Sequence, residues 1–372
     1  MSAEPPAPEL AVPADRWELG SHFHLVASAG AGDAPWPWPA EHHRLATGRA
    51  ALVTLVRHGL RTRGWRRLWV PSHFCQEVLV PLVDAGIELA VYPAAVDQEG
   101  LPPIRVPAGP GDAVLDVNLL GLRSASILAR EWPDGVEIIE DHTHDPLASW
   151  AARSDADWCV ASLRKTLPIP DGAVLWSPRG HPLPPLPDPA PADGVEARLA
   201  AMTLKREWLR GASDDRDRYR RLELDAERRL GEAPPAAMSG WSEALLVGMP
   251  AGRWRERRRA NHRLLADALD GVRGARLLRP DPDAVPFAGT LLCDTAAVRD
   301  GLRERLITAR VYPPVLWPLE PAAVQGIPPE HVAASRRILS LPCDFRYGAD
   351  DVRRLAGLVR DALAALAGAE TA

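Results

Sequence analysis

Lysine is almost absent from this sequence. The chain of 372 residues has forty-two arginines and only two lysines, Lys165 and Lys205. Both residue types serve as surface cations, but a guanidinium has a pKa above about 12 and cannot act as an amine nucleophile. A lysine kept in such a sequence is a candidate for amine chemistry, with chance survival as the alternative. We expect amine chemistry at Lys165, in "ASLRKTLPIPDG", and an ordinary surface position for Lys205, in "MTLKREWLRG".

Cysteine is also scarce. Cys75, Cys159, Cys293 and Cys343 are too few and too scattered for a disulfide framework or a CxxC metal site, which favours a reducing cytoplasm. No apolar run approaches the roughly 18 residues of a transmembrane helix, so we expect no membrane partner. The net charge of −5 argues against a nucleic-acid partner.

We assign no function to two segments of unusual composition. "RWRERRRANHR" (253–263) is the most basic cluster, and we interpret it as a solvated helix face. "MSAEPPAPELAVPAD" (1–15) is rich in proline and glutamate and lacks the pattern of a signal peptide, so a disordered tail is predicted there.

The sequence does contain an alternation of short apolar runs and helical stretches between about residues 65 and 178. The near-continuous apolar character of the runs predicts strands buried on both faces, as in a mostly parallel sheet. A one-sided helix ended by glycine is predicted over 48–64. The predicted strands are 66–71, 87–93, 113–120, 136–141, 158–163 and 173–178.

A second, smaller lobe is predicted after this α/β region. The Pro-rich stretch 181–194 is expected to form a loop, and charged helices are expected at about 195–233 and 252–270. Strands at 290–294 and 337–342 and a terminal helix at 351–366 then indicate an α+β piece. We therefore expect a large α/β domain over 16–235 and a small C-terminal domain over 236–372.

Polar residues gather where the predicted strands end, which is where open α/β sheets bind their ligands. Asn118, the cluster "EDHTHD" (140–145) and the segment from Ser162 to Lys165 all fall at such ends. The helix that begins at Gly48 offers free backbone N–H groups, which suit an anion.

One chemistry for these strand ends is metal-dependent hydrolysis. His142 and His144 alternate along the chain, so both could bind a metal, with Lys165 as a carbamylated ligand in an amidohydrolase-type site. The alternative is that the two histidines are polar loop residues. We assign no metal ligand and keep this hydrolase as the remote possibility.

The other chemistry is that of pyridoxal phosphate. This cofactor needs a lysine for its Schiff base, a carboxylate against its pyridine nitrogen and an anion site for its phosphate. Asp141 ends one predicted strand and is a suitable carboxylate, while Lys165 follows the next strand. The hydroxyl of Ser162 and the helix start at Gly48 supply donors for a phosphate.

Five segments, in this order, resemble the DegT/DnrJ/EryC1/StrS family of sugar aminotransferases, which are fold type I pyridoxal-phosphate enzymes. The resemblance runs from about residue 45 to the C-terminus and is strongest to about 178. The segments are "TGRAAL" (47–52), "VPSHFCQEVLVPLVDAGIELAVY" (70–92), "VNLLG" (117–121), "IIEDHTH" (138–144) and "SLRKTLPIPDGAV" (162–174). The fold it implies is the fold type I architecture, a large mostly parallel sheet lobe with a smaller α+β lobe.

The resemblance also implies catalytic roles. Lys165 would form the Schiff base and shuttle the proton. Asp141 would pair with the pyridinium nitrogen, and His144 would hydrogen-bond the phenolic oxygen of the cofactor or stack near it. Asn118 is a weaker candidate for cofactor contact, with a strand-end cap as the alternative.

Further residues would bind the phosphate and the ring. The backbone N–H groups of Gly48, Arg49 and Ala50 would hold the phosphate together with the Ser162 hydroxyl. Phe74 is the candidate aromatic over the ring, although the aromatic of the family may align with Cys75 instead, and Phe74 could be plain core.

The sequence departs from the family pattern in several places. Arg49 stands in the phosphate loop where the family has a small hydroxyl residue, and it could contact the phosphate or point outward. Only two residues separate Ser162 from Lys165, and "PDGAV" has a single glycine. We find no counterpart of the Asn-His-Gly segment that normally reaches the phosphate from a neighbouring subunit.

The implied function is an aminotransferase that moves an amino group from a glutamate-like donor to a keto sugar or a secondary-metabolite intermediate. Another carbanion reaction of the cofactor, such as decarboxylation, elimination or aldol cleavage, is the alternative. The resemblance implies a homodimer with active sites between subunits, and the cysteine usage favours the cytoplasm. Arg346 is one candidate for binding a substrate carboxylate, and the segment 311–319 is expected either to line the entrance or to pack as a strand and turn.

Overall fold

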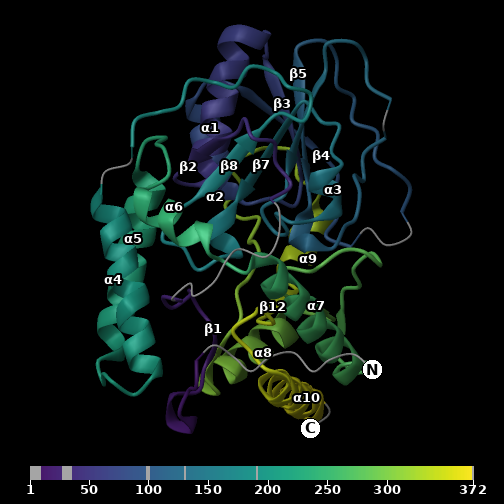
Figure 1. The fold of residues 1–372 in the computed structure, drawn as a ribbon. Coiled ribbons are helices and arrows are strands. Elements are labelled where there is room, and N and C mark those ends of the chain that lie inside the picture. Colours follow the sequence, from purple (N-terminus) through teal and green to yellow (C-terminus); the bar gives the residue numbers. More distant parts are fainter. Residues whose placement is uncertain (1–9, 27–35, 98–100, 130, 190–191, 371–372) are drawn as a thin grey trace.

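The computed structural model describes residues 10–26, 36–97, 101–129, 131–189 and 192–370, which form two lobes (Figure 1). The large lobe contains a seven-stranded sheet with the order β2-β8-β7-β6-β5-β3-β4. The described pairings are parallel except those of β8 with β7 and β2, so the predicted mostly parallel sheet is confirmed. The strands are β2 (His43–Leu45), β3 (Arg67–Pro71), β4 (Glu88–Tyr92), β5 (Asp112–Val117), β6 (Glu137–Asp141), β7 (Trp158–Ser162) and β8 (Ala173–Trp176).

The buried character of the central strands follows from their sequences. Every residue of β5, β7 and β8 is buried, as their apolar runs predict for strands covered on both faces. Helix α1 (Gly48–His58) packs an apolar side against this sheet and continues through a π-helical turn to Gly64. Helix α2 (Gln76–Asp84) follows β3.

The charged region predicted as helical over 195–233 is a hairpin of two helices. Helix α4 (Ala192–Leu209) and helix α5 (Arg216–Glu232) pack side by side at one edge of the molecule (Figure 1). Gly211 has a φ of 74°, a conformation that favours glycine and that ends the first helix. The carboxylate of Asp215 then caps the second helix by accepting from the Arg218 N–H.

The smaller lobe has its own core and an antiparallel sheet with the order β12-β10-β9. The predicted strands near 290 and 338 and the terminal helix are present, whereas β9 and α8 were not predicted. Helix α6 (Gly240–Val247) packs against the large lobe through Leu246. The elements of the smaller lobe are α7 (Ala251–Ala268), β9 (Ala275–Leu277), β10 (Gly289–Cys293), α8 (Ala296–Thr308), β11 (Val311–Tyr312), α9 (Pro329–Ser335), β12 (Ile338–Leu341) and α10 (Ala349–Glu370).

The N-terminal part of the chain joins this smaller lobe. Strand β1 (Leu19–Gly20) pairs in parallel with β11, and Leu19 packs in the second core, although the expected division places it with the large lobe. The division near residue 235 stays a prediction. The tail expected over 1–15 lies outside the described residues as far as residue 9, and Ala14–Arg16 forms a short 3-10 helix.

Two expectations about charged residues are wrong. The cluster 253–263 is not a solvated face, because Arg257 and Arg258 are only 8% and 6% exposed. Arg255 and Arg258 both form ion pairs with the buried Asp145, which compensates for their burial.

Among the described helices, none is long and apolar enough to cross a membrane.

Lys205 is likewise not a surface residue. It is 1% exposed, and its Nζ lies 3.3 Å from a carboxylate oxygen of Glu18. It also donates hydrogen bonds to the Ser21 hydroxyl and the His22 carbonyl. These partners, all from the N-terminal segment, replace the water that the ammonium loses on burial.

Candidate active site

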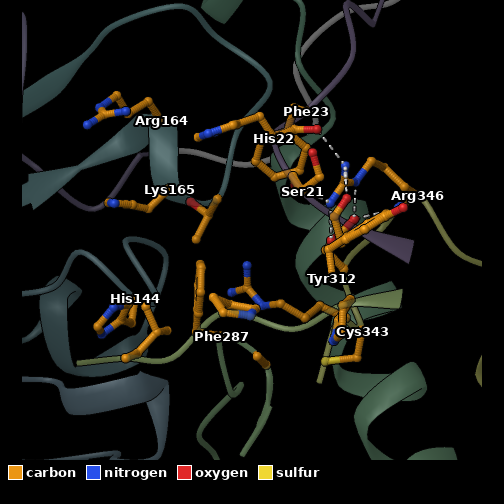
Figure 2. Close-up of a pocket in the computed structure, with 18 of the residues that line it drawn as sticks. Ser21, His22, Phe23, His144, Arg164, Lys165, Phe287, Tyr312, Cys343 and Arg346 are labelled. Carbon is orange, nitrogen blue, oxygen red and sulfur yellow. Dashed lines mark hydrogen bonds and ion pairs between the residues drawn. The ribbon is translucent and has the colours of Figure 1, made fainter. Parts of the chain in front are cut away.

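A cavity of about 290 Å³ lies between the two lobes, and Lys165 and His144 are among the residues that line it. Figure 2 shows these two side chains on one side of the cavity and Tyr312, Cys343 and Arg346 on the other. The ends of β6 and β7 bring His144 and Lys165 there, as expected for ligands of an open α/β sheet.

Lys165 ends the short 3-10 helix η4 (Leu163–Lys165), which directly follows β7. Its side chain is open to solvent through the cavity in the single chain. Desolvation by the surrounding protein lowers the pKa of its ammonium, and the positive charge of Arg164 lowers it further. A lowered pKa raises the fraction of neutral amine, which is the nucleophilic form.

His144 is held as a neutral imidazole beside the cavity. Its Nδ1 accepts a hydrogen bond from the Leu120 N–H at 3.0 Å, which puts the ring proton on Nε2. The ring lies 5.3 Å from Trp317 in a stacked arrangement and 5.0 Å from Phe287. Burial lowers the pKa of His144 to about 3, and the charge of Lys165 acts in the same direction.

Asp141 is a buried carboxylate at the end of β6, and it is not among the residues that line the cavity. Its Oδ1 accepts from the Thr143 N–H at 2.8 Å, and the Thr143 hydroxyl in turn accepts from the Ser162 N–H. Burial raises the pKa of Asp141, while the hydrogen bonds from Thr143 lower it. A cationic partner would stabilise its charged form.

Asn118 lies next to Asp141. Its backbone N–H donates to the Asp141 carbonyl at 2.9 Å. The side chain is fully buried, and its Nδ2 has no hydrogen-bond partner among the described residues. The structure therefore brings Asn118 to the predicted position but leaves its amide donor available.

The start of α1 meets Ser162. A Cβ atom added at Gly48 would lie 3.0 Å from the Ser162 Cβ, which is tighter than ordinary van der Waals contact, so a larger residue here would have to displace Ser162. Thr47 caps the helix by accepting from the Ala50 N–H, and the first turn leaves the N–H groups of Gly48 and Arg49 without helical acceptors. The free N–H groups of this first turn and the Ser162 hydroxyl therefore lie close together, and they are named here the anion cradle.

The side chain of Arg49 points away from this cradle. Its guanidinium donates to the Gly231 carbonyl and lies 3.6 Å from a Glu77 oxygen. Of the two alternatives raised by the sequence, the outward orientation is the one observed. Arg49 can contribute only its backbone N–H to an anion here.

Phe74 is a core residue in this structure. It is buried in the main hydrophobic cluster, tilts against Trp317 and does not line the cavity. The neighbouring Cys75 is half-buried, and the charge of Lys165 acts on it: burial raises the pKa of its thiol, while Lys165 lowers it. Cys75 therefore lies within electrostatic reach of Lys165.

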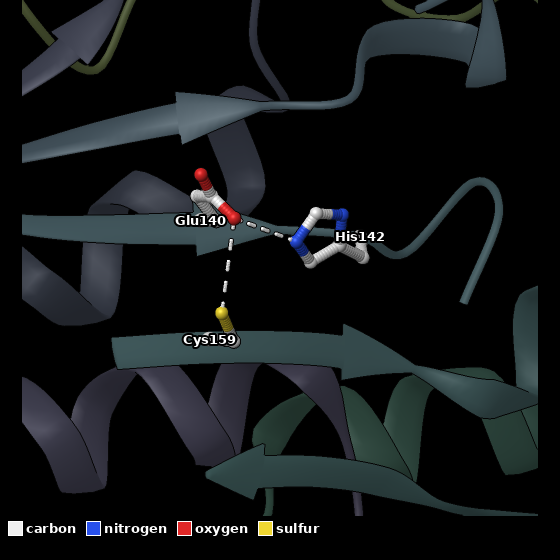
Figure 3. A group of neighbouring side chains, drawn as sticks. All are labelled: Glu140, His142 and Cys159. Atoms are coloured by element: carbon white, nitrogen blue, oxygen red, sulfur yellow. Dashed lines mark hydrogen bonds and ion pairs between the residues drawn. The ribbon is translucent and has the colours of Figure 1, made fainter. Parts of the chain in front are cut away.

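His142 belongs to a different cluster (Figure 3). Its Nε2 lies 3.0 Å from a Glu140 oxygen, and the ligand atoms of Glu140, His142 and Cys159 all lie within 4.8 Å of one another. Trp150 donates a further hydrogen bond to Glu140. His144 faces the cavity instead, so the two histidines of the proposed hydrolase do not converge on one metal.

Sequence reasoning missed several cavity residues. Arg164 and Arg198 come from η4 and α4, while Gly20–Phe23 come from the N-terminal segment. The scarcity of lysine was the available signal for the N-terminal segment, because Lys205, the second of the two lysines, donates hydrogen bonds to it. The segment 311–319 does line the cavity, through residues that include Tyr312 and Trp317.

Arg346 has another function in this structure. It forms two hydrogen bonds with Asp344 and donates to the His22 carbonyl at 3.0 Å. Its donors are engaged within the protein, so it is a poor candidate for a substrate carboxylate.

No family model matches this sequence, and no curated protein matches it. Solved structures are similar in fold. The PMP-form of Spr1654 from Streptococcus pneumoniae has a TM-score of 0.62 at 11% identity and covers 96% of this chain and 100% of its own. The aminotransferase TlmJ from Streptoalloteichus hindustanus has a TM-score of 0.57 at 19% identity, with 88% and 86% covered.

The sugar aminotransferase CalS13 from Micromonospora echinospora has a TM-score of 0.53 at 14% identity and covers 96% of this chain and 99% of its own. The agreement extends over both lobes in each case. The chain therefore has the fold of these aminotransferases, which is the architecture that the sequence resemblance led us to expect.

Proposed function

We propose that this protein is a pyridoxal-phosphate-dependent aminotransferase that moves an amino group from a glutamate-like donor to a keto sugar or a related secondary-metabolite intermediate. The observation that carries the proposal is the cavity lined by Lys165 and His144, together with the buried carboxylate of Asp141 at the end of β6. The names of the similar structures support it, since CalS13 is a sugar aminotransferase and Spr1654 was solved in a PMP-form.

The residues present fit the three recognition groups of pyridoxal phosphate. Gly48 and Ser162 form a cradle that a larger residue at position 48 would fill, and it suits the phosphate. Asp141 is a buried carboxylate for which no ion pair occurs among the described residues, and it suits a protonated ring nitrogen. Lys165 supplies the amine for the aldehyde.

When bound, the cofactor supplies an electron sink for the carbanion at the substrate carbon. Lys165 Nζ would accept a proton from the substrate carbon, because its lowered pKa favours the neutral amine. Asp141 would hold the proton on the ring nitrogen. His144 carries its proton on Nε2 and would donate it to the phenolic oxygen, while Trp317 and Phe287 pack against its ring.

The decisive experiment is an absorbance spectrum of the protein with pyridoxal phosphate, followed by borohydride reduction and peptide mapping. The proposal expects the reduced adduct on the peptide that contains Lys165. An adduct on another residue, or none, would refute it.

The reaction type has its own test. Glutamate added to the loaded protein should convert the cofactor to its amine form, seen as a spectral change. If no amino donor produces this conversion while the Lys165 adduct is present, another carbanion reaction of the cofactor replaces the transaminase assignment.

The proposed assembly is a homodimer, as the resemblance implies. Sedimentation of the loaded protein should give twice the mass of the 40.4 kDa chain. A monomer that turns over would contradict a shared active site.

A further inference from the structure

The N-terminal segment Glu18–His24, named here the N-terminal strap, forms one wall of the cavity. It starts in β1, which pairs with β11, and the Gly20 N–H donates to the Tyr347 hydroxyl at 2.7 Å. The chain then passes through Ser21, His22 and Phe23, which all line the cavity (Figure 2). Residues remote in sequence from Lys165 thus face the same space.

The strap is fixed by buried cations. Lys205 Nζ donates to the His22 carbonyl at 2.6 Å and to the Ser21 hydroxyl at 3.1 Å. Arg346 donates to the same His22 carbonyl from the other side. His22 is therefore held in one backbone position before any ligand arrives.

Arg198 contacts the strap from within the cavity wall. It is 5% exposed, and its Nη2 donates to His22 Nδ1 at 2.6 Å. Its Nε and Nη1 are buried and have no hydrogen-bond partner among the described residues. A buried guanidinium with two unused donor nitrogens is costly unless an acceptor completes it.

The positively charged side chains around Arg198 outnumber the carboxylates near them. The nearest carboxylate to Arg198 is that of Glu227 at 3.7 Å. Both oxygens of Glu227 already accept from Arg164, at 2.7 and 2.8 Å. Lys165 adds a further positive charge, and Glu223 is a second carboxylate that acts on Arg198, so three cations face two carboxylates. An anion is the group that this arrangement attracts.

His22 adds a neutral donor. Because Arg198 donates to Nδ1, the ring proton of His22 resides on Nε2. Burial and the charge of Arg198 lower the pKa of His22 well below its ordinary value, so the ring stays neutral. A neutral N–H beside a guanidinium is suited to an oxygen acceptor.

We propose that Arg198 and His22 form a subsite that binds an anionic group of the substrate, a carboxylate or a phosphate, while the reacting carbon faces Lys165. The proposal rests on the proposed function for the identity of that carbon. The cofactor phosphate is assigned elsewhere, because the cradle of Gly48 and Ser162 is not part of the cavity wall. Lys205 is a positioning residue, since it acts only through the strap.

The test measures binding without turnover. Titration calorimetry follows glutarate and, separately, inorganic phosphate binding to the protein loaded with pyridoxal phosphate. Arg198→Met should weaken at least one of these anions by about tenfold or more, the usual loss for a charge-assisted hydrogen bond. His22→Asn should weaken the same anion less, and Arg198→Lys should restore part of the affinity.

The matched control is Arg210→Met, which removes the same charge from an exposed position just beyond α4. It should bind both anions as the unchanged protein does. Arg198→Met should fold, because Glu227 keeps its two hydrogen bonds from Arg164, and circular dichroism checks this.

Three results would overturn the subsite. The first is that Arg198→Met binds both anions as the unchanged protein does, and the second is that the unchanged protein binds neither. The third is a loss of cofactor affinity in Arg198→Met with anion binding intact, which would assign Arg198 to the cofactor phosphate. A missing Lys165 adduct would refute the proposed function alone, since the same titrations on the protein without cofactor would still test anion binding by Arg198.

Discussion

At the scale of single residues, both lysines contribute to the same cavity. Lys165 opens into the cavity, and Lys205 holds the strap that walls it. The sequence predicted the first through the chemical difference between an amine and a guanidinium. It could not predict the second, because the partners of Lys205 come from about 180 positions away and only the fold brings them together.

Lys165→Arg tests the amine chemistry itself. The variant keeps the positive charge but has no amine, so aminotransfer and the borohydride-trapped adduct should both disappear while the fold remains. Mass spectrometry of reduced protein and a glutamate-dependent spectral assay measure the two effects. Retention of the adduct in this variant would show that another amine carries it.

Lys205→Met removes one partner of a buried ion pair. The carboxylate of Glu18 would keep Arg216 at 3.3 Å but lose its ammonium, so we expect the free energy of unfolding to fall by about 3 kcal/mol. Urea unfolding measures it. Limited proteolysis should also cut the strap faster.

The control for Lys205→Met is the double variant with Glu18→Gln, which removes both charges. It should recover part of the lost stability, because no uncompensated carboxylate remains buried. A single variant as stable as the unchanged protein would show that the pair does not hold the strap.

At the scale of elements, α1 connects stability to the proposed phosphate site. Thr47→Ala removes the side-chain acceptor of the Ala50 N–H, which should lower the free energy of unfolding by about 1 kcal/mol. The same change loosens the first turn and should weaken pyridoxal phosphate binding. Urea unfolding and cofactor titration measure both, and Thr47→Ser should behave nearly as the unchanged protein.

The elements were predictable where local pattern decides them. The apolar runs of β3 to β8 and the one-sided pattern of α1 marked their positions to within a few residues. The break between α4 and α5 and the two-residue strands β1 and β11 were not marked. These short strands form because residues 19–20 pair with residues 311–312. A contact between segments so far apart in the chain leaves no local pattern in the sequence.

At the scale of the whole molecule, buried neutral histidines set a pH dependence. Burial lowers the pKa of His24 to about 3 and those of His73 and His262 to about 4. The unfolded chain, with histidine near pH 6.5, binds more protons than the folded one between these values. Stability should therefore fall as the pH drops below about 6.5.

His262→Asn removes one of these contributions and so isolates it from the others. A comparison of variants is needed because burial raises the pKa of Asp116 to about 6, and this carboxyl group makes stability change with pH in the opposite direction. Each histidine contributes up to about 1.4 kcal/mol per pH unit within its window. Urea unfolding between pH 4.5 and 6.5 should show a shallower slope for the variant by about that amount. An equal slope would mean that His262 is protonated in the folded protein.

The candidate site was predictable in its centre and not in its walls. Lys165, Asp141 and His144 follow strands of one sheet, so their order along the chain indicates their proximity. Arg198 lies in a hairpin beyond the sheet and His22 in the N-terminal strap. With forty-two arginines in the chain, residue type alone cannot single out one of them.

The N-terminal strap has a practical consequence for anyone who prepares this protein. A fusion tag, or a protease site placed between residues 10 and 24, would lie on or beside the N-terminal strap, which forms one wall of the cavity. Trimming the chain to residue 25 would remove His22, the pairing of β1 with β11 and the contacts of Lys205, so the proposed anion subsite would lose one of its two residues.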